Sequence, residues 1–363
     1  MCDVYSNAHV IISAEAAKDA NQGFLFQRNS EGTDRSFMLP YFLVNGSDYG
    51  SVYLQQETSE DSSLMYLSSR ACSFQERRLS TRVLDYRAGQ ISLICRTGMI
   101  AETSSVIEKL SINIYQAGSR PLSLSVPAFD GDEKYHEVCL EWYKGVENYS
   151  RRYLTHGSDR LLALSGYAHA MHEVFKGTYL AGIWKQDLLV GLLWSASSTR
   201  NRLRRPSQSR CPSWSWAALD GGIDYHLFWI QYGNPRQESG LQLKLVEEEV
   251  RPVGVDIMGQ VISGRLSVSG HMKKVRCLPA GLGVAWGRRD VFTSSDVENW
   301  DALGDLVADD EHFFSPTNST GKPFAICLFD TEDVHPKDIW CLAVVSRRGI
   351  VLEYLADKTS TIV

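Results

Sequence analysis

The sequence predicts an α+β protein, in which a helical middle packs on a β-rich C-terminal half whose antiparallel sheet is barrel-like or sandwich-like. Two patterns predict this class. Between residues 132 and 198, apolar side chains recur at spacings of three and four, the period of helices that bury one face. In 241–280 and 323–356, alternating apolar residues and glycine turns are typical of strands. We expect two regions, 1–222 and 223–363, that share one hydrophobic core.

The N-terminal part of the sequence predicts short elements. Residues 4–20 are small and apolar and favour a helix or a strand, whereas 21–60 mixes apolar runs with Gly, Asn, Ser and Asp, which indicates loops and edge strands. Within 79–96, the runs VLDY and ISLIC predict two strands that are joined through Ala88–Gly89.

Three helices are expected in the middle of the chain. The first begins at Asp132, whose carboxylate suits a first helical turn, and it carries an apolar stripe over Tyr135–Tyr149. The second spans Asp159–Phe175, with Ser158 or Asp159 as its N-cap. The third spans Trp184–Ser198 and is nearly all apolar, as a core helix would be.

Composition excludes several classes of protein. The net charge is −6 and no long basic stripe occurs, so we expect no nucleic-acid partner. The dense basic run Arg200–Arg210 is interpreted as a solvated loop. No apolar stretch approaches the ~20 residues that span a bilayer, and the N-terminus lacks a signal pattern. We therefore expect a cytoplasmic protein; its oligomeric state is left open.

The sequence offers little for a metal or a cofactor. The eight cysteines form no C-x-x-C pair, which excludes a disulfide framework or a zinc site and predicts reduced thiols. His169, His172 and Glu173 do not follow the H-E-x-x-H pattern and lack an evident third ligand. No G-x-S-x-G elbow or phosphate-binding lysine loop occurs. We expect no metal and no cofactor.

Aromatic and charged side chains supply the candidate site. The run PSWSW places Trp214 and Trp216 on one face of an extended segment, where they either pack in the core or form the wall of a ligand cavity. The adjacent charges Glu76 and Arg77 either form a structural ion pair in a strand-and-loop block or line a pocket. Similarly, Asp159 is interpreted as a helix cap and Arg160 as the residue next to that cap, in preference to a functional role for either.

Five runs, in this order along the chain, resemble the fungal heterokaryon-incompatibility (HET) domain family: VYSNAHVIISAEAAKDANQGFL, SRACSFQERRLSTRVLDY, YSRRYLTHGSDRLLALSGYA, TYLAGIWKQDLLVGLLW and CPSWSWAALDGGI. The second run is similar to the family block R-x-W-x-x-Q-E-R-x-L-S-x-R-x-L, with Cys72 at the usual tryptophan. The family's opening blocks would lie upstream, and the chain leaves no room for them before Met1. The resemblance therefore covers only the C-terminal portion of the family.

The resemblance implies three functions. Shortened HET-like proteins occur in fungal natural-product pathways, and one type closes a norbornene ring in a sordarin-type terpenoid by a Diels–Alder reaction. The second function is that of a non-enzymatic recognition or incompatibility protein. The third is that of an NAD-degrading signalling enzyme, which the missing front blocks disfavour. Our working hypothesis is the cofactor-independent cyclase, with a small hydrophobic, terpenoid-like partner. Its expected catalytic residues are Tyr179, Arg77 and His226, and its expected substrate-binding residues are Trp184, Trp214, Trp216, Tyr225 and Trp229.

Overall fold

The chain divides into two compact units, Met1–Ser125 and Val126–Val363. The boundary predicted at residue 222 falls inside the second unit. The computed structural model describes residues 2–25, 37–42, 49–54, 65–96, 98–102, 108–109, 132–197, 203–225, 243–270, 272–279, 313–317, 327–328, 338–345, 348–354 and 360–362. Each unit is described by itself.

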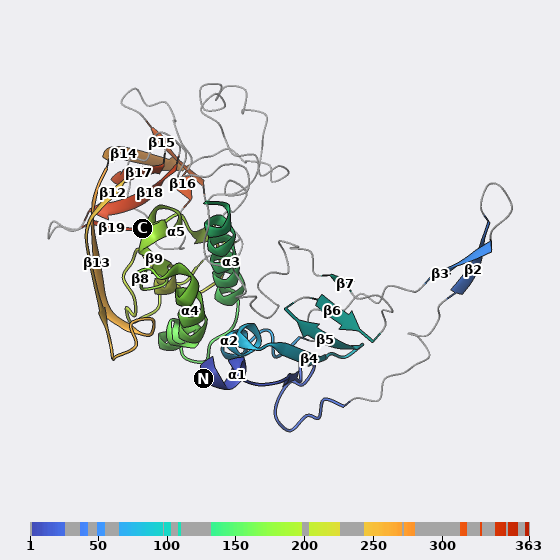
Figure 1. Ribbon diagram of the computed structural model, residues 1–363. Helices are drawn as coiled ribbons and strands as arrows, with labels where there is room; N and C mark the ends of the chain where they lie inside the picture. Colours follow the sequence, from blue (N-terminus) through green and yellow to red (C-terminus); the bar gives the residue numbers. More distant parts are fainter. Residues whose placement is uncertain are drawn as a thin grey trace. The chain divides into compact units, whose positions relative to one another are not determined.

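The described part of the first unit contains short helices, one mixed sheet and a separate hairpin (Figure 1). The helices are α1 (Cys2–Ser6) and α2 (Cys72–Leu79). The sheet has the order β1 (Ile11–Ser13), β4 (Arg82–Tyr86), β5 (Ile91–Cys95), β6 (Gly98–Ala101) and β7 (Glu108–Lys109). The hairpin pairs β2 (Phe37–Phe42) with β3 (Tyr49–Leu54).

Strands β4 and β5 confirm the two strands predicted within 79–96. They pair antiparallel, and the turn between them is closed where the Arg87 N–H donates to the Gln90 carbonyl at 3.1 Å. β1 pairs with β4 in parallel, so β4 is an interior strand of the sheet. Alternate side chains of β4, Val83 and Asp85, are buried. The strand therefore presents a carboxylate to the interior of the first unit.

The QER run forms helix α2, and the predicted strand and loop were wrong there. Gln, Glu and Arg are good helix formers. A helix also places Phe74 and Arg78, four residues apart, on one face, and both are buried. Burial of that face, rather than a period visible in the apolar residues alone, accounts for the helix.

The helical part of the second unit confirms the first two predicted helices. α3 spans Asp132–Ser150 and α4 spans Leu162–Phe175. The predicted N-cap of α4 was wrong. Gly157–Arg160 forms a 3-10 turn, η3, ahead of α4, and the hydroxyl of Ser158 bonds to the Asp159 carboxylate at 3.2 Å instead of to a helix N–H.

The third predicted helix, Trp184–Ser198, was largely wrong. The chain there forms a hairpin of β8 (Tyr179–Leu180) and β9 (Ile183–Trp184), the 3-10 turn η4 (Lys185–Asp187), and a short α5 (Leu188–Gly191). β10 (Ser195–Ala196) follows and pairs with β11 (Ile223–Asp224). An apolar run that is buried on all sides has no period that separates a helix from a set of buried turns.

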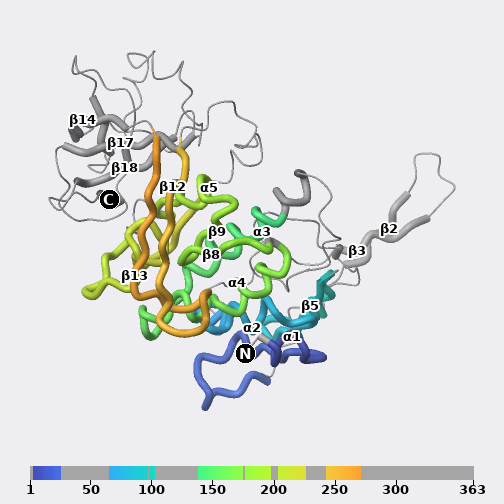
Figure 2. Tube along the Cα trace, turned by 60° about the vertical axis from the view of Figure 1, so that its left-hand side comes forward, coloured from blue at the N-terminus to red at the C-terminus, as the bar shows by residue number. Residues whose placement is uncertain are grey.

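The β-rich part of the second unit consists of a ribbon and a larger sheet. The ribbon, β12–β13, pairs Lys244–Pro252 with Val261–Ser269 and is the long pair of strands seen beside β8 and β9 in Figure 2. The larger antiparallel sheet has the order β16 (Cys327–Leu328), β15 (Phe313–Thr317), β14 (Met272–Pro279), β17 (Asp338–Val345), β18 (Arg348–Tyr354) and β19 (Ser360–Ile362). Its end strands, β16 and β19, do not pair, so the described strands close no barrel. The fold is mixed helix and strand with mainly antiparallel sheets.

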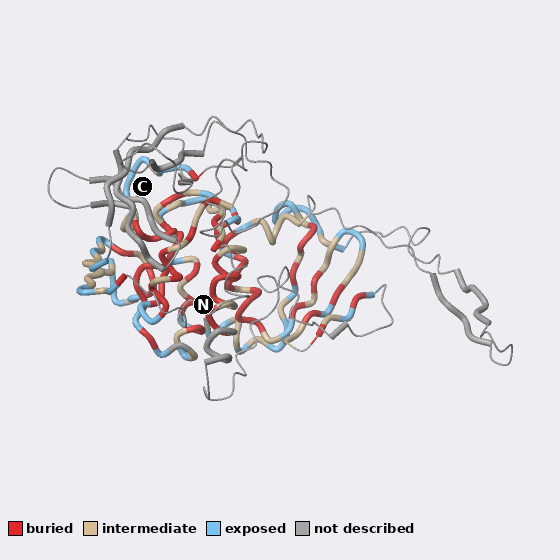
Figure 3. Tube along the Cα trace, turned by 90° about the horizontal axis from the view of Figure 1, so that it is seen from above, coloured by how far each residue is buried: buried red, intermediate tan, exposed pale blue. Residues whose placement is uncertain are grey.

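The core of the second unit lies among α3, α4, the β8–β9 hairpin and the 3-10 turn η5 (Trp216–Ala218). Figure 3 shows long buried stretches in this part of the chain. The largest of its fully buried side chains include three tryptophans and three tyrosines: Trp142, Trp184, Trp216, Tyr149, Tyr167 and Tyr225. Among the helices that the structure describes, none has both the length and the apolar composition that crossing a bilayer requires.

Candidate functional site

Five rings from three parts of the second unit form a group that we call the ring cluster, in which all but the half-buried His172 are buried: Trp142, Tyr167, His172, Tyr179 and Trp184. Trp142 of α3 stacks on Tyr167 of α4, with 5.4 Å between ring centroids. Trp184 meets Trp142 and Tyr179 edge to face, at 5.5 and 5.1 Å, and stacks with His172 at 6.0 Å. The ring cluster is an apolar surface with N–H and O–H groups at its edges.

The β8–β9 hairpin holds Tyr179 and Trp184 in the ring cluster. Its turn, Ala181–Gly182, has positive φ at both residues (42° and 101°). Two side chains from the PSWSW run fix this turn. The Ser215 hydroxyl donates to the Ala181 carbonyl at 2.6 Å, and the Trp216 indole N–H donates to the Gly182 carbonyl at 2.9 Å.

The PSWSW run is not the extended segment that was predicted. It forms a turn and then η5, where the Ser215 hydroxyl also accepts a bond from the Ala217 N–H at 3.1 Å. Trp214 and Trp216 are therefore not side by side on a strand face. Trp216 packs edge to face on Tyr149, at 6.1 Å between centroids. The Trp214 carbonyl accepts from the Trp194 indole at 3.1 Å.

A second buried group, which we call the phenol group, consists of Tyr143, Tyr225, Asp187 and Glu147. The hydroxyl of Tyr143 donates to the Asp187 carboxylate. The rings of Tyr143 and Tyr225 lie 4.4 Å apart between centroids, and the Tyr225 backbone N–H donates to the Glu147 carboxylate at 2.7 Å. Helix α3, turn η4 and the segment after β11 thus converge on this group.

Burial governs the protonation of these groups. It raises the pKa of Tyr143 well above the ordinary value, with the Asp187 charge acting in the same direction. Burial likewise raises the pKa values of Tyr179 and Tyr225. The pKa of Glu147 rises to about 7, mainly through burial and further through the charge of Asp224. At neutral pH the three phenols are hydrogen-bond donors.

Several buried polar atoms of the two groups have an unmet hydrogen bond among the described residues. They are the hydroxyls of Tyr179 and Tyr225, the indole nitrogen of Trp142 and Nδ1 of His172. An unmet donor in a core costs free energy, about 1–3 kcal/mol, so such atoms are uncommon in folded proteins. Unmet donors beside buried aromatic rings are the feature expected of a site that receives a ligand acceptor atom.

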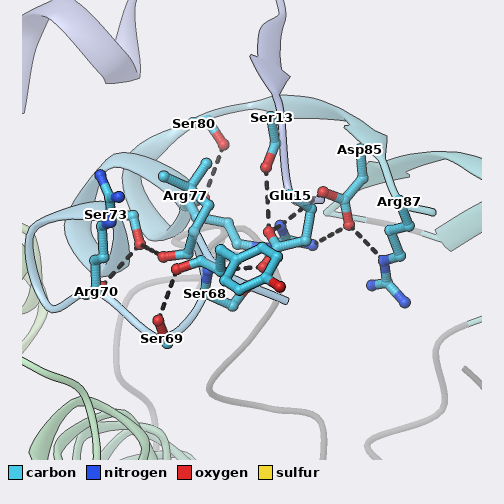
Figure 4. Close-up of polar contacts among 12 residues, drawn as sticks. Ser13, Glu15, Ser68, Ser69, Arg70, Ser73, Arg77, Ser80, Asp85 and Arg87 are labelled. Carbon is cyan, nitrogen blue, oxygen red and sulfur yellow. Dashed lines mark hydrogen bonds and ion pairs between the residues drawn. The ribbon is translucent and has the colours of Figure 1, made fainter. Parts of the chain in front are cut away.

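Arg77 belongs to the first unit, where a network of ion pairs engages it (Figure 4). Its guanidinium binds both oxygens of Asp85, at 3.1 and 2.8 Å, and lies 3.5 Å from Glu15. Arg87 binds Asp85 at 2.9 Å, and the Ser68 N–H donates to Glu15 at 2.7 Å. The partner of Arg77 is therefore not its neighbour Glu76. These bonds join the segment that follows β1 to α2 and β4.

Arg160, which the sequence suggested only as the residue next to a helix cap, makes several buried contacts. Its side chain is buried, and one guanidinium nitrogen donates to the carbonyls of Ser150 and Gly221, at 3.3 and 2.6 Å. The guanidinium carbon lies 5.4 Å from the ring centroid of Trp216, a cation–π contact. Burial lowers the pKa of Arg160 to about 10, so it stays charged. Arg160 thus joins the end of α3 to the segment that carries Trp216.

The basic run 200–210 is only partly a solvated loop. Arg204 is exposed, as predicted. For Arg210 the prediction was wrong, because its side chain is 9% exposed, donates to the Ala217 carbonyl at 2.9 Å and pairs with Asp220 at 2.6 Å. The donors of a guanidinium can satisfy several carbonyls of one loop at once.

Of the residues expected at the site, the structure brings Tyr179 and Trp184 together directly, and Trp216 contacts the turn between them. Tyr225 lies in the phenol group. His226 and Trp229 lie outside the described residues. Sequence reasoning missed Tyr143, Glu147, Asp187 and, as a site residue, Trp142. The apolar stripe of α3 marked the two aromatic residues as buried, but no local signal pointed to the two carboxylates.

The described residues contain no group of three or more His, Cys, Asp or Glu side chains placed to hold a metal ion. His169 pairs instead with Asp256, at 2.8 Å. Comparisons of the chain with family models, with curated proteins and with solved structures each gave no match.

Proposed function

We propose that the second unit binds a small hydrophobic carbonyl compound at the ring cluster and closes a ring in it by an intramolecular Diels–Alder cycloaddition. The observation that carries this proposal is the pair of buried phenol hydroxyls, Tyr179 and Tyr225, whose O–H groups have no acceptor among the described residues. Both are neutral donors, and a carbonyl oxygen would satisfy them. The resemblance to shortened HET-like proteins suggested the reaction class, and we propose that relationship as well.

The cycloaddition requires the protein to bind and orient the substrate, and it requires no nucleophile. Two π bonds of a diene and one π bond of an alkene become two σ bonds and one π bond within one molecule, and no proton moves. Holding a flexible substrate in the reactive fold can supply on the order of 7–11 kcal/mol at the extreme. Donors placed in advance on the carbonyl of the alkene partner stabilise the negative charge that grows on its oxygen. We assign no step to a cofactor.

We assign roles as follows. Tyr179 and Tyr225 donate to the carbonyl oxygen, and the rings of Trp142 and Trp184 provide the apolar surface. Trp216 acts through the β8–β9 turn that it holds, and is a positioning residue. Arg77 is engaged by carboxylates of the first unit, so we propose no contact between it and the substrate. The free thiols of Cys72 and Cys211 are consistent with the proposed cytoplasmic setting.

The test is turnover of a terpenoid that carries a cyclopentadiene and an unsaturated aldehyde, followed by NMR detection of the norbornene. We expect Tyr179→Phe and Tyr225→Phe each to lower kcat about tenfold, less than loss of an oxyanion donor costs, because the carbonyl gains only partial charge. The control Tyr153→Phe removes a hydroxyl from a 79% exposed tyrosine and should leave kcat unchanged. A wild-type rate equal to the rate in buffer would exclude the proposal.

A second candidate function is recognition of a protein partner. Large apolar side chains on the ribbon and its connecting turn are exposed: Val246, Val253, Val255, Ile257 and Ile262. Exposed apolar groups gathered on one element are typical of interaction surfaces. Sedimentation of the full chain over a range of concentrations tests self-association, and Val255→Lys with Ile262→Lys should abolish any association that uses this surface.

A further inference from the structure

The ribbon β12–β13 buries little of its own surface. Along its two strands only Val261 is buried, while the remaining described side chains are half-buried or exposed. Leu243 before the ribbon and Met258 in its turn are its further buried apolar side chains. Segments with few buried apolar contacts open locally at a small fraction of the cost of global unfolding.

Four polar contacts between described residues join the ribbon and its connecting turn to the helical part of the second unit. Lys185 pairs with Glu248, and His169 bonds to Asp256 at 2.8 Å. Gln260 donates to the Ser158 carbonyl at 3.2 Å and to the Asp159 carboxylate at 3.3 Å. The side chains of Lys185 and His169 are 40% and 49% exposed, so both pairs are weak and accessible to salt.

The anchoring residues lie next to the ring cluster in the chain. Lys185 directly follows Trp184, and His169 lies one turn before His172 in α4. The ribbon also lies against the PSWSW segment. At Gly264, an added Cβ would be 2.6 Å from Pro212 and 3.1 Å from the Trp214 ring. Figures 1 and 2 both show the ribbon running alongside the β8–β9 hairpin.

We propose that the β12–β13 ribbon is a detachable cover of the ring cluster, held closed by the Lys185–Glu248 and His169–Asp256 pairs. As an account of how a ligand enters, this inference rests on the proposed function. The opening of the ribbon while α3 and α4 stay folded does not depend on that function. A two-stranded ribbon without support is marginally stable in water, so detachment also breaks its cross-strand hydrogen bonds.

Hydrogen exchange of the full chain, resolved by peptide, tests the opening. In the wild type, amides of 244–269 should exchange faster than amides of α3. The double variant Lys185→Ala with Asp256→Asn should speed exchange in 244–269 by about 2- to 30-fold, the range that two exposed pairs allow. Exchange in α3 should not change. Addition of 1 M NaCl to the wild type should have a similar effect, because salt screens exposed pairs.

Arg251→Ala is the matched control. Arg251 pairs with Glu249 at 2.6 Å, and this exposed pair lies within the ribbon. Its loss should change ribbon exchange less than twofold. Equal exchange rates in the ribbon and α3 of the wild type, or no response to loss of the two anchoring pairs, would overturn the cover.

Turnover of the cyclopentadiene aldehyde separates the two proposals. A ribbon that opens in a protein that never turns the aldehyde over leaves the cover intact and removes the proposed function. Turnover in a protein whose ribbon stays closed supports the proposed function and excludes the cover. If the ribbon opens and the aldehyde is turned over, the double variant should show a changed kcat/KM and the Arg251→Ala variant should not.

Discussion

The indole N–H of Trp216 donates to the Gly182 carbonyl at 2.9 Å, and the same indole nitrogen would lie 2.7 Å from a Cβ added at Gly182. The glycine also has φ of 101°, in a region that side chains disfavour. One residue thus provides both the turn of the β8–β9 hairpin and the space for the tryptophan that fixes it. The hydrogen bond and the missing side chain depend on each other.

Gly182→Ala should therefore lower the free energy of unfolding by about 2–4 kcal/mol, through backbone strain and the clash with Trp216. Urea denaturation followed by tryptophan fluorescence measures the loss. Gly254→Ala is the control, because its Cβ would meet nothing within 4 Å. Equal stability of the two variants would contradict this account of the turn.

Asp85→Asn should destabilise the first unit by up to about 3–5 kcal/mol, because it removes the carboxylate that binds two nitrogens of the buried Arg77 guanidinium and leaves it with Glu15, 3.5 Å away. Since the two units need not unfold together, exchange of amides in β4 and β5 is the appropriate measurement. Arg87→Ala removes a more exposed partner of the same carboxylate and should cost less. A larger loss in Arg87→Ala would reverse the assigned order of the two ion pairs.

The same carboxylate predicts acid sensitivity of the first unit. Burial alone would raise the pKa of Asp85, but the hydrogen bonds and charges of Arg77 and Arg87 outweigh it, and the pKa falls below 3.8. Its stabilisation is fully present above the unfolded pKa and is lost as pH falls through the folded value. Exchange in β4 should rise as pH falls below about 4, after correction for intrinsic rates, and this rise should be absent in Asp85→Asn.

Glu147 predicts the opposite trend at higher pH. Its folded pKa of about 7 exceeds the ordinary 4.5, so the folded state holds a proton that the unfolded state releases. Stability therefore falls as pH rises from about 4.5 to 7, by up to about 3 kcal/mol, and then levels off. Glu147→Gln keeps an oxygen acceptor for the Tyr225 N–H and should be more stable than wild type at pH 8. Exposed Glu173→Gln should show no such gain, and a gain equal to that of Glu147→Gln would contradict the assignment.

At Tyr179 and Tyr225, we expect loss of the hydroxyl to lower activity without lowering stability. Tyr179→Phe and Tyr225→Phe remove hydroxyls whose buried O–H groups have no acceptor among the described residues, so they should keep or raise the melting temperature. Tyr143→Phe loses the bond to Asp187 and leaves a buried carboxylate without that donor, so it should lower stability by about 1–3 kcal/mol. Calorimetry compares the three variants. Destabilisation of Tyr179→Phe to the level of Tyr143→Phe would indicate that its hydroxyl has a partner in solution.

The sequence alone determined the elements whose burial follows a period. The stripe in Tyr135–Tyr149 predicted α3, and the runs VLDY and ISLIC predicted β4 and β5, because each of these elements buries one face against a neighbour. It also identified Tyr179, Trp184 and Trp216 as members of one aromatic region. For Trp184–Ser198 it could not separate a helix from a hairpin and turns, since most side chains from Asp187 to Ala196 are buried.

Only the tertiary structure decided what these side chains contact. Glu147 and Asp187 reach the phenol group from α3 and η4, Arg77 finds Asp85 eight residues along the chain rather than adjacent Glu76, and Trp216 bonds to a turn 34 residues away. Hydrogen bonds, ion pairs and shifted pKa values depend on distances and burial between separated segments. The order of residues along the chain does not specify those distances. The sequence therefore predicted aromatic rings of the site but not the carboxylates of Glu147 and Asp187 that contact them.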